Sequence, residues 1–458
     1  MIEAVPASFR DPSGYVFRED GVLYRHVDAS YSAHWAALRS SGLLRDLQEL
    51  GLLIPHEEVD AARSPTPGAV AVLRPERVPF WSQPYEWCFS QLKDAALATL
   101  DIQEHALRAG MTLKDASAYN IQFLRGRPIL IDTLSFELRE PGSPWRAYRQ
   151  FCRHFLAPLA MAAYVSPDAG LLSRTFLDGV PLDLASASLP GKTRLKPGLT
   201  LHLHAHASAE RKADGTPRPQ SASVGEHAAL GLVDHLRSTI EGLHWDPGST
   251  VWADYYGSTN YSADAFGEKR RLVSDWIAAL SPAPATIWDL GANTGEFSSL
   301  AAQSGARVVA WDIDPGAVER HYLTVREQEV PNVLPLVQDL TNPSPAIGWG
   351  LAERESLLDR ADADLAMALA LVHHLAIGNN VPLPALAEFF ARLAPRLIIE
   401  FVPKSDSQVQ RLLATRPDIY EGYTEEGFRD AFARCFDTVR HQRIDGSERT
   451  LFLMERHG

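Results

Sequence analysis

From residue 286 onward, short apolar runs alternate with segments in which apolar residues recur every three or four positions. Continuous short runs are typical of buried parallel strands, and the longer periodicity is typical of amphipathic helices. The runs predict strands at 286–290, 307–311, 333–337, 363–369 and 396–401, and the periodic segments predict helices at 295–303, 315–328, 383–393 and 424–434. This alternation predicts an α/β fold with a doubly wound sheet.

Two further stretches, 436–442 and 450–454, flank Asp445-Gly446, a dipeptide typical of hairpin turns. They predict a terminal strand pair that closes the sheet. The N-terminal part has a different pattern, with a hairpin predicted around Glu19-Asp20-Gly21, an apolar strand at 70–73 and a helix over 86–109. This mixture predicts an α+β domain before the α/β domain.

Segment 193–225 is rich in Pro, Gly and Ser and shows little apolar periodicity, as exposed connectors do. A shorter break, Ser281-Pro282-Ala283-Pro284, precedes the first strand of the α/β region. We therefore predict an N-terminal domain over 1–190, a linker with bridging or lid helices over 191–284, and a C-terminal domain over 285–458.

The composition is that of an ordinary globular protein with two or three domains. The 458 residues include 57 acidic and 44 basic side chains, for a formal charge of −13, and 45% are hydrophobic. No apolar run approaches the ~20 residues that span a bilayer, and the N-terminus lacks the apolar core of a secretory signal. Cys88, Cys152 and Cys435 lie far apart in the sequence and match no CxxC or zinc spacing. These features predict a cytoplasmic protein without a membrane span.

The acidic balance argues against a long nucleic-acid footprint, because phosphate binding requires clustered Lys and Arg. One basic stretch, which comprises Lys192, Arg194 and Lys196 and then Arg211 and Lys212, lies in linker-like sequence. We interpret it as a solvated loop. Nucleic acid is therefore not expected as a partner.

A polar and glycine-containing turn follows the first predicted strand of the α/β domain. It comprises Asp289, Gly291, Asn293 and Gly295, and a helix begins at Glu296. Glycines at such a turn let the backbone approach a ligand, and a helix N-terminus presents free N–H groups. By itself the turn is also compatible with a purely structural βα connection.

Two further carboxylates are expected at the same edge of the sheet. Asp312 ends the second strand, where a carboxylate can accept hydrogen bonds from the two hydroxyls of a ribose. Asp339, followed by Leu340, comes after the third strand, where a carboxylate can accept a hydrogen bond from an adenine amino group. Acids after three successive strands predict a nucleoside site.

With these residues in place, 285–455 resembles class I S-adenosylmethionine-dependent methyltransferases. The likeness rests on Asp289-x-Gly291-x-x-x-Gly295, on Asp312 and Asp339, on the segment 368–375 after the fourth strand, and on the terminal hairpin. It implies a Rossmann-like seven-stranded sheet with S-adenosyl-L-methionine as cofactor. The turn at Gly291 and Gly295 would hold the methionine part. The pattern GxGxxG of dinucleotide-binding proteins is absent, which speaks against NAD.

Methyl transfer from a sulfonium mainly requires alignment of the acceptor, with a base where the acceptor is a hydroxyl or a protonated amine. His373 and His374 follow the fourth strand and are candidates for a base or for acceptor positioning, and Glu400 is a weaker one. Capping and packing explain the two histidines equally well. Lys269 and the upstream residues Trp252, Tyr255, Tyr256, Asn260 and Tyr261 are interpreted either as a lid or as packing between domains.

In the N-terminal domain, Asp115, Asn120 and the strand-borne Asp132 have the spacing of protein kinases. That looser resemblance, over about 13–190, implies Asp115 as base and Asn120 and Asp132 as metal ligands. No glycine-rich phosphate loop is visible, and only Arg25 stands where such folds place a lysine. A kinase-like scaffold or acceptor-binding module, an active kinase and chance turn chemistry all remain open.

The layout of the whole chain is similar to that of nodulation-related bacterial methyltransferases. We therefore predict a methyltransferase that acts by direct in-line transfer to a small-molecule or glycan acceptor, without a metal. A bifunctional kinase–methyltransferase and a catalytically silent cofactor-binding scaffold are the alternatives. The sequence identifies neither the acceptor atom nor the oligomeric state.

Overall fold

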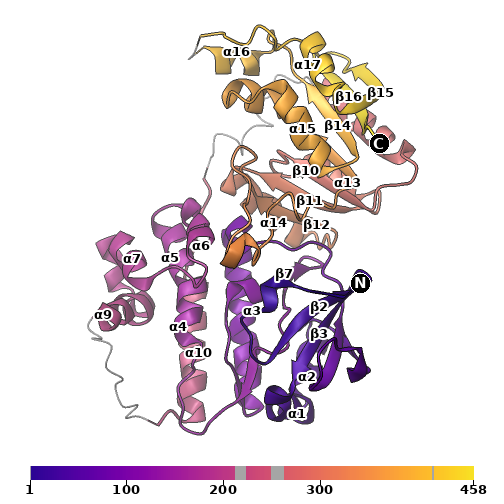
Figure 1. Ribbon diagram of the computed structural model, residues 1–458. Coiled ribbons are helices and arrows are strands. Elements are labelled where there is room, and N and C mark those ends of the chain that lie inside the picture. Colours follow the sequence, from indigo (N-terminus) through magenta and orange to yellow (C-terminus); the bar gives the residue numbers. More distant parts are fainter. Residues whose placement is uncertain (1, 212–222, 249–262, 415–416) are drawn as a thin grey trace. The chain divides into compact units, whose positions relative to one another are not determined.

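The computed structural model describes residues 2–211, 223–248, 263–414 and 417–458. The chain forms two compact units (Figure 1). Unit 1 comprises Met1–Asp246 and Ala346–Arg354, and unit 2 comprises Pro247–Pro345 and Glu355–Gly458. Trp252, Tyr255, Tyr256, Asn260 and Tyr261, which were interpreted either as a lid or as packing between domains, lie outside the described residues.

Unit 1 begins with a five-stranded antiparallel sheet of order β1-β2-β3-β5-β4. The predicted hairpin joins β2 to β3 through Asp20 and Gly21, whose φ angles of 50° and 82° suit a tight turn. The strands are β1 (Ile2–Ala4), β2 (Gly14–Glu19), β3 (Val22–Asp28), β4 (His56–Val59) and β5 (Ala69–Pro75).

A long helix, α3 (Phe89–Arg108), follows this sheet and buries an apolar stripe that includes Leu92, Ala96 and Leu100. Two small antiparallel pairs come next: β6 (Met111–Leu113) with β9 (Phe136–Leu138), and β7 (Ile121–Leu124) with β8 (Arg127–Leu130). The other α-helices of unit 1 are α1 (Ser32–Ser40), α2 (Leu43–Glu49), α4 (Tyr148–Phe151), α5 (Ala157–Tyr164), α6 (Leu172–Thr175), α7 (Leu182–Ser188), α8 (Pro197–Leu199), α9 (His206–Arg211) and α10 (Glu226–Glu241).

Of the segment predicted to be a linker with bridging helices, the described residues up to 246 are folded into unit 1, whereas 263–284 belongs to unit 2. Lys192 and Arg194, which were interpreted as part of a solvated loop, lie in the short helix η8 (Gly191–Leu195), and the π-helix η9 (Thr200–Ala205) follows α8. Buried His204 hydrogen-bonds both Ser186 Oγ and Thr193 Oγ1, at 2.9 Å each. Helical turns this short develop no 3.6-residue periodicity, so the Pro and Gly residues between them resembled a connector.

Unit 2 contains a seven-stranded sheet of order β12-β11-β10-β13-β14-β16-β15. The first five strands in this order are parallel, and β16 runs antiparallel to β14 and β15. The predicted α/β sheet and its terminal hairpin are thus confirmed. The strands are β10 (Thr286–Leu290), β11 (Arg307–Asp312), β12 (Val333–Val337), β13 (Leu365–Ala368), β14 (Arg396–Phe401), β15 (Phe436–Arg443) and β16 (Thr450–Arg456).

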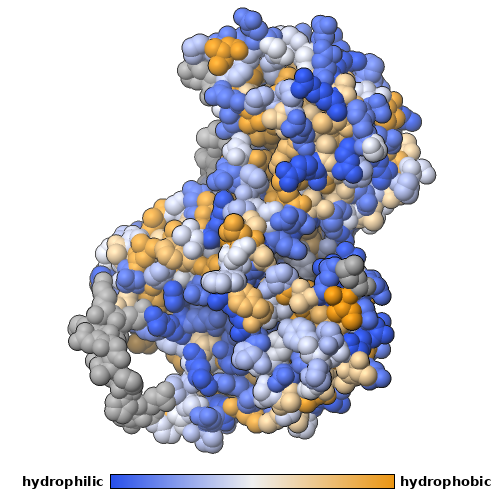
Figure 2. Space-filling view, in the orientation of Figure 1, coloured by the Kyte–Doolittle hydropathy of each residue, from blue (hydrophilic) through white to orange (hydrophobic). Residues whose placement is uncertain are grey.

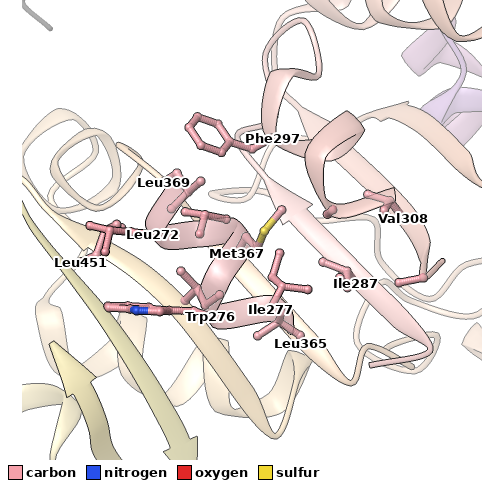
Figure 3. Packing of buried hydrophobic residues seen from close by; sticks show 14 of the residues in the cluster. Leu272, Trp276, Ile277, Ile287, Phe297, Val308, Leu365, Met367, Leu369 and Leu451 are labelled. Atoms are coloured by element: carbon pink, nitrogen blue, oxygen red, sulfur yellow. The ribbon is translucent and has the colours of Figure 1, made fainter. Parts of the chain in front are cut away.

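The helices of unit 2 are α12 (Ala263–Ala279), α13 (Glu296–Ala302), α14 (Pro315–Glu327), α15 (Leu383–Leu393), α16 (Ser407–Leu413) and α17 (Glu425–Phe432). Figure 3 shows Leu272, Trp276 and Ile277 of α12 in one cluster with Ile287 and Met367 of the sheet. This packing fixes α12 against the sheet, which matters because α12 also supplies a side chain to the site described below.

Hydrophilic residues cover much of the visible surface of both units, with hydrophobic ones interspersed among them (Figure 2). Within the described ranges, no helix has both the length and the apolar character that a membrane crossing requires.

Candidate functional site

A cavity of about 310 Å³ lies at the carboxyl ends of the central parallel strands of unit 2. Open α/β sheets bind ligands at this edge. The cavity is lined by Phe266, Lys269, Asp289, Gly291, Ala292, Asn293, Phe297, Trp311, Asp312, Ile313, Gln338, Asp339, Leu340, Thr341, Leu369, Ala370, Leu371, His374, Leu375, Gly378, Asn379 and Leu412. Every residue predicted to bind a cofactor lines it except Gly295.

The turn after β10 contributes Gly291, Ala292 and Asn293 to the cavity lining. Gly291 has φ 76°, and a Cβ added there would lie 3.2 Å from Leu371. Asn293 also adopts a left-handed conformation, with φ 52°, although it carries a side chain. Gly295 (φ 88°) packs behind the turn, where an added Cβ would come within 2.0 Å of His321 Nε2. Gly291 thus opens the cavity, while Gly295 allows α13 to begin against α14.

Asp289 is buried at the end of β10, and its Oδ2 accepts a hydrogen bond of 2.6 Å from Ser298 Oγ. Burial raises the pKa of Asp289 to about 6, and the nearby Asp312 carboxylate adds to this shift. Ser298 and Lys269 act in the opposite direction. The carboxylate therefore faces the cavity in a low-dielectric setting, where a cationic group is a favourable partner.

Asp312 ends β11, and its carboxylate accepts hydrogen bonds from two turns, the one after β10 and the one after β11. Its Oδ2 accepts from the backbone N–H of Asn293 at 2.7 Å, and its Oδ1 accepts from the N–H of Asp314 at 2.9 Å. Burial raises the pKa of Asp312 to about 6, and the two backbone hydrogen bonds partly offset the shift. A carboxylate has about four lone-pair sites, so acceptor capacity remains for hydroxyl donors in the cavity.

Asp339 and Leu340 lie at the next strand end, after β12. Asp339 Oδ1 accepts from the backbone N–H and the Oγ1 of Thr341, at 2.8 and 2.6 Å. These bonds fix the carboxylate in a partly buried position. Leu340 and Ile313 add apolar surface to the same part of the cavity lining. A carboxylate beside apolar side chains suits a planar heterocycle that carries an amino group.

The two histidines after β13 occupy different environments. His374 lines the cavity, whereas His373 is fully buried and not part of the lining. Their rings lie 4.0 Å apart between centroids. Burial lowers the pKa of His374 to about 4 and that of His373 well below its usual value. His374 is therefore neutral at pH 7 and able to accept a hydrogen bond, but it is a weaker base than the sequence suggested.

Glu400 does not line the cavity but belongs to a buried ionic cluster. Its Oε2 lies 2.6 Å from Lys269 Nζ, and its Oε1 lies 3.5 Å from Arg449 Nη1. Arg449 Nε in turn contacts Asp406 Oδ2 at 2.7 Å. Since both oxygens of Glu400 face cations, this residue anchors side chains rather than serving as a base.

Several lining residues were not predicted to contact a cofactor. Lys269 was interpreted as part of a lid or as packing between domains, and Phe266, Phe297 and Leu412 were not considered. A signal for Lys269 was present, because it interrupts an apolar stripe of Leu272, Trp276 and Ile277 with the spacing of a helix. A charged residue on such a stripe indicates a paired or functional group.

In unit 1, the structure brings Asp115, Asn120 and Asp132 together. Asn120 Nδ2 donates to Ser135 Oγ at 3.4 Å, and Ser135 Oγ donates to Asp132 Oδ2 at 2.8 Å. Burial and the charge of Asp132 raise the pKa of Asp115. Arg25 Nη1 lies 2.6 Å from Asp132 Oδ1. Across the described residues, no group of three or more His, Cys, Asp or Glu side chains is arranged to hold a metal ion.

Segment Ala346–Arg354 follows the Asp339 loop in the chain yet belongs to unit 1. Arg10 donates to both carboxylate oxygens of Glu353, at 2.5 and 2.9 Å. The guanidinium of Arg354 lies 4.5 Å from the ring centroid of Tyr119. A bidentate ion pair and a cation–π contact therefore secure this segment within unit 1.

Together, the sheet order and the acidic, glycine-lined cavity define an α/β protein with a cavity at the carboxyl edge of a parallel sheet. Nodulation protein NoeA of Rhizobium meliloti (strain 1021) is 36% identical to this chain over 463 residues, which cover 99% of the chain and 96% of NoeA. The chain belongs to the family of NoeA. The predicted similarity to nodulation-related proteins is thereby confirmed. No family model matches the chain.

Solved structures with similar regions include two proteins with TM-scores of 0.32. Magnesium protoporphyrin IX methyltransferase (ChlM) from Synechocystis PCC 6803, with bound SAH, is 19% identical and covers 45% of this chain and 93% of its own. WbdD, crystallised with the kinase inhibitor LY294002, is 16% identical and covers 48% of this chain and 47% of its own. Likenesses of this strength carry no functional inference.

Proposed function

We propose that unit 2 binds S-adenosylmethionine in the cavity at the edge of its sheet. The observation that supports this proposal is that Asp289, Asp312 and Asp339 follow three neighbouring parallel strands and line one cavity. Asp312 would accept hydrogen bonds from the ribose hydroxyls, and Asp339 one from the adenine amino group. Asp289 and the turn at Gly291 would face the methionine part.

The reaction would be direct, in-line methyl transfer by a class I enzyme. When bound, S-adenosylmethionine supplies a methyl group activated by its sulfonium. The chain's contribution would be to orient the acceptor and to exclude water with apolar lining residues such as Leu371, Leu375 and Leu412. His374 would accept a hydrogen bond from the acceptor, while buried His373 would hold the ring of His374 in place.

We further propose a small-molecule or carbohydrate-linked acceptor. This acceptor class is carried over from the resemblance of the chain's layout to nodulation-related methyltransferases, and the chain is 36% identical to nodulation protein NoeA. Of the described residues that line the cavity, Lys269 is the only lysine or arginine. A phosphate backbone would therefore find little cationic surface there, which disfavours a nucleic-acid acceptor.

Calorimetric titration of the full chain with S-adenosylhomocysteine tests the proposal. We expect saturable binding at one site, and substitution of Asp312 by Ala should weaken it. Absence of binding by the wild-type chain would contradict the proposal. Production of S-adenosylhomocysteine from S-adenosylmethionine in the presence of cell extract would separate an enzyme from a silent scaffold.

For unit 1 we propose a kinase-like scaffold without phosphoryl-transfer activity. The supporting observation is that Asp132 is engaged by Arg25 on one oxygen and by Ser135 on the other, which leaves it poorly disposed to bind a divalent cation. Titration with ATP and Mg²⁺ should show no binding. Binding that disappears on substitution of Asp132 by Ala would instead support the bifunctional alternative.

A further inference from the structure

The backbone of Ala370 is left-handed, with φ 53°. Residues other than glycine rarely adopt this conformation, because it brings Cβ close to the following carbonyl oxygen, and the exceptions are mainly Asn and Asp, whose side chains hydrogen-bond locally. Alanine has no such side chain. Among the described residues other than glycine, Leu351 is the one other apolar residue with a positive φ. Strain of this kind persists only where the surrounding structure enforces it, and it is concentrated at functional sites.

The chain is held firmly on both sides of Ala370. Upstream, β13 lies between β10 and β14 in the centre of the sheet. Downstream, His373 is fully buried, and the backbone N–H groups of His374 and Leu375 both donate to the carbonyl oxygen of Leu371, at 3.0 and 3.3 Å. Because both flanks are fixed, the change of direction between them falls on the left-handed bend.

The bend faces the cavity. In the stretch 365–373 every residue is buried except Ala370 and Leu371, and both of these line the cavity. A Cβ added to Gly291 would lie 3.2 Å from Leu371 Cδ1, so Leu371 packs directly against the glycine turn after β10. The direction that the chain takes at Ala370 therefore decides where Leu371 stands.

The same wall of the cavity continues into the π-helix η11 (His374–Gly378). Three residues of this helix line the cavity: His374, Leu375 and Gly378. Turns of π-helix are rare and occur frequently at functional sites. Two unusual backbone features, the left-handed residue and the π-helix, thus follow one another in one continuous wall.

We propose that Ala370 is a positioning residue, whose left-handed bend holds Leu371 against the Gly291 turn and His374 at the cavity before a ligand arrives. This inference rests on the proposed function and adds a residue that acts through Leu371 and His374. A wall that is already ordered lowers the ordering cost of binding. Alanine has one narrow energy well at positive φ, whereas glycine has a broad one, so alanine keeps the bend rigid at a cost in stability.

Ala370→Gly separates the rigidity of the bend from the stability of the protein. Glycine relieves the strain, so we expect the melting temperature to rise by about 2 °C. The bend then also samples other conformations, and the affinity for S-adenosylhomocysteine should fall by about fivefold, as if about one fifth of the molecules kept the binding-competent wall. Thermal unfolding and calorimetric titration of the full chain measure the two effects. A residue with a purely structural role would not lose affinity while the protein gains stability.

Glu329→Gly is the matched control. Glu329 has φ 50°, follows α14 and does not line the cavity. The same relief of strain should raise the melting temperature by a similar amount, and the affinity for S-adenosylhomocysteine should equal that of the wild type. Hydrogen–deuterium exchange gives a second measurement. The amides of His374 and Leu375 should exchange faster in Ala370→Gly than in the wild type, and at the wild-type rate in Glu329→Gly.

The outcomes separate this inference from the proposed function. An Ala370→Gly variant that binds S-adenosylhomocysteine as tightly as the wild type, or that is less stable, would overturn the positioning role and leave the proposed function standing. In the wild type, amides of His374 and Leu375 that become protected only after S-adenosylhomocysteine is added would also overturn it, because the wall would then form with the ligand. Wild-type protein that does not bind S-adenosylhomocysteine would overturn both.

Discussion

Asp312, at the end of β11, accepts a hydrogen bond from the backbone N–H of Asn293, in the turn that follows β10. The bond holds Asn293 in its left-handed conformation and joins two neighbouring βα turns. The same carboxylate lines the cavity. Asp312 therefore shapes the glycine-containing turn and offers acceptor atoms to a ligand, so its two roles are structurally linked.

Replacing Asp312 by Ala should weaken binding of S-adenosylhomocysteine by about 100-fold, because two ribose hydroxyls lose a charged acceptor and the turn loses its anchor. Isothermal titration calorimetry measures this change. Asp437→Ala is a suitable control, since its side chain is 85% exposed and belongs to the terminal hairpin. Equal affinities of the Asp312 variant and the wild type would show that the nucleoside does not bind through this carboxylate.

Cofactor affinity should depend on pH through Asp312. Burial raises the pKa of this carboxyl to about 6, so in the free protein it takes up a proton as the pH falls through 6. The protonated form accepts hydrogen bonds poorly, and ribose hydroxyls then compete with the proton. We expect affinity to be constant above about pH 7 and to fall below pH 6. Asp289, with a pKa of about 6, contributes in the same direction.

Calorimetric titrations with the cofactor at pH values from about 5 to 8 measure how its affinity depends on pH. Proteins are usually most stable in about this pH range. Asp312→Asn should bind more weakly at pH 8 and show a shallower pH dependence than the wild type. A profile that is flat in the wild type would exclude a titrating carboxylate from the binding site.

Gly295→Ala should be strongly destabilising. The backbone there has φ 88°, and the added Cβ would meet the buried ring of His321 at 2.0 Å. Gly305 has nearly the same φ, 86°, with nothing within 4 Å of an added Cβ. Gly305→Ala should therefore cost only the backbone strain, about 1 kcal/mol, whereas Gly295→Ala should cost about 3 kcal/mol or more. Urea unfolding of both variants tests the difference, and equal losses would contradict the role of His321.

Arg449→Leu should lower the free energy of unfolding by about 3–5 kcal/mol, because buried Asp406 and Glu400 lose a cation that cannot be replaced by water. Arg443→Leu is the matched control, since its side chain is 65% exposed and lies 4.0 Å from Glu448. That change should cost less than about 1 kcal/mol. Thermal and urea unfolding give both values. Similar losses for the two variants would show that the buried cluster is not a stabilising unit.

The sheet and its acidic edge could be predicted because the signals are local. A strand buried on both faces, such as β13, is a continuous apolar run, and parallel strands direct their carboxyl ends to one edge. The acids that follow such strands, including Asp312 and Asp339, must therefore converge. The left-handed turn at Gly291 likewise follows from glycine between a strand and a helix.

Other parts of the site depend on contacts between distant residues. His373 and His374 are adjacent in sequence, and only the rotation of the chain after β13 places one in the cavity lining and buries the other. Glu400 is paired with Lys269 and Arg449, more than a hundred and about fifty positions away. No local pattern encodes such pairs. The short turns around His204 are ordered by buried hydrogen bonds instead of by a repeating apolar stripe, and this is why the sequence around them resembled a connector.

The assignment of Ala346–Arg354 to unit 1 has a practical consequence for dissecting the protein. A truncated chain that begins near the start of β10 would carry Glu353 and Arg354 but would lack Arg10 and Tyr119, to which they are bound. Such a fragment would leave the charges at positions 353 and 354, in the same connection that begins at Asp339, without these partners. Loss of ligand affinity after truncation could then result from disruption of the loop that follows Asp339. Co-expression of the two pieces would keep Arg10 and Tyr119 available to this loop.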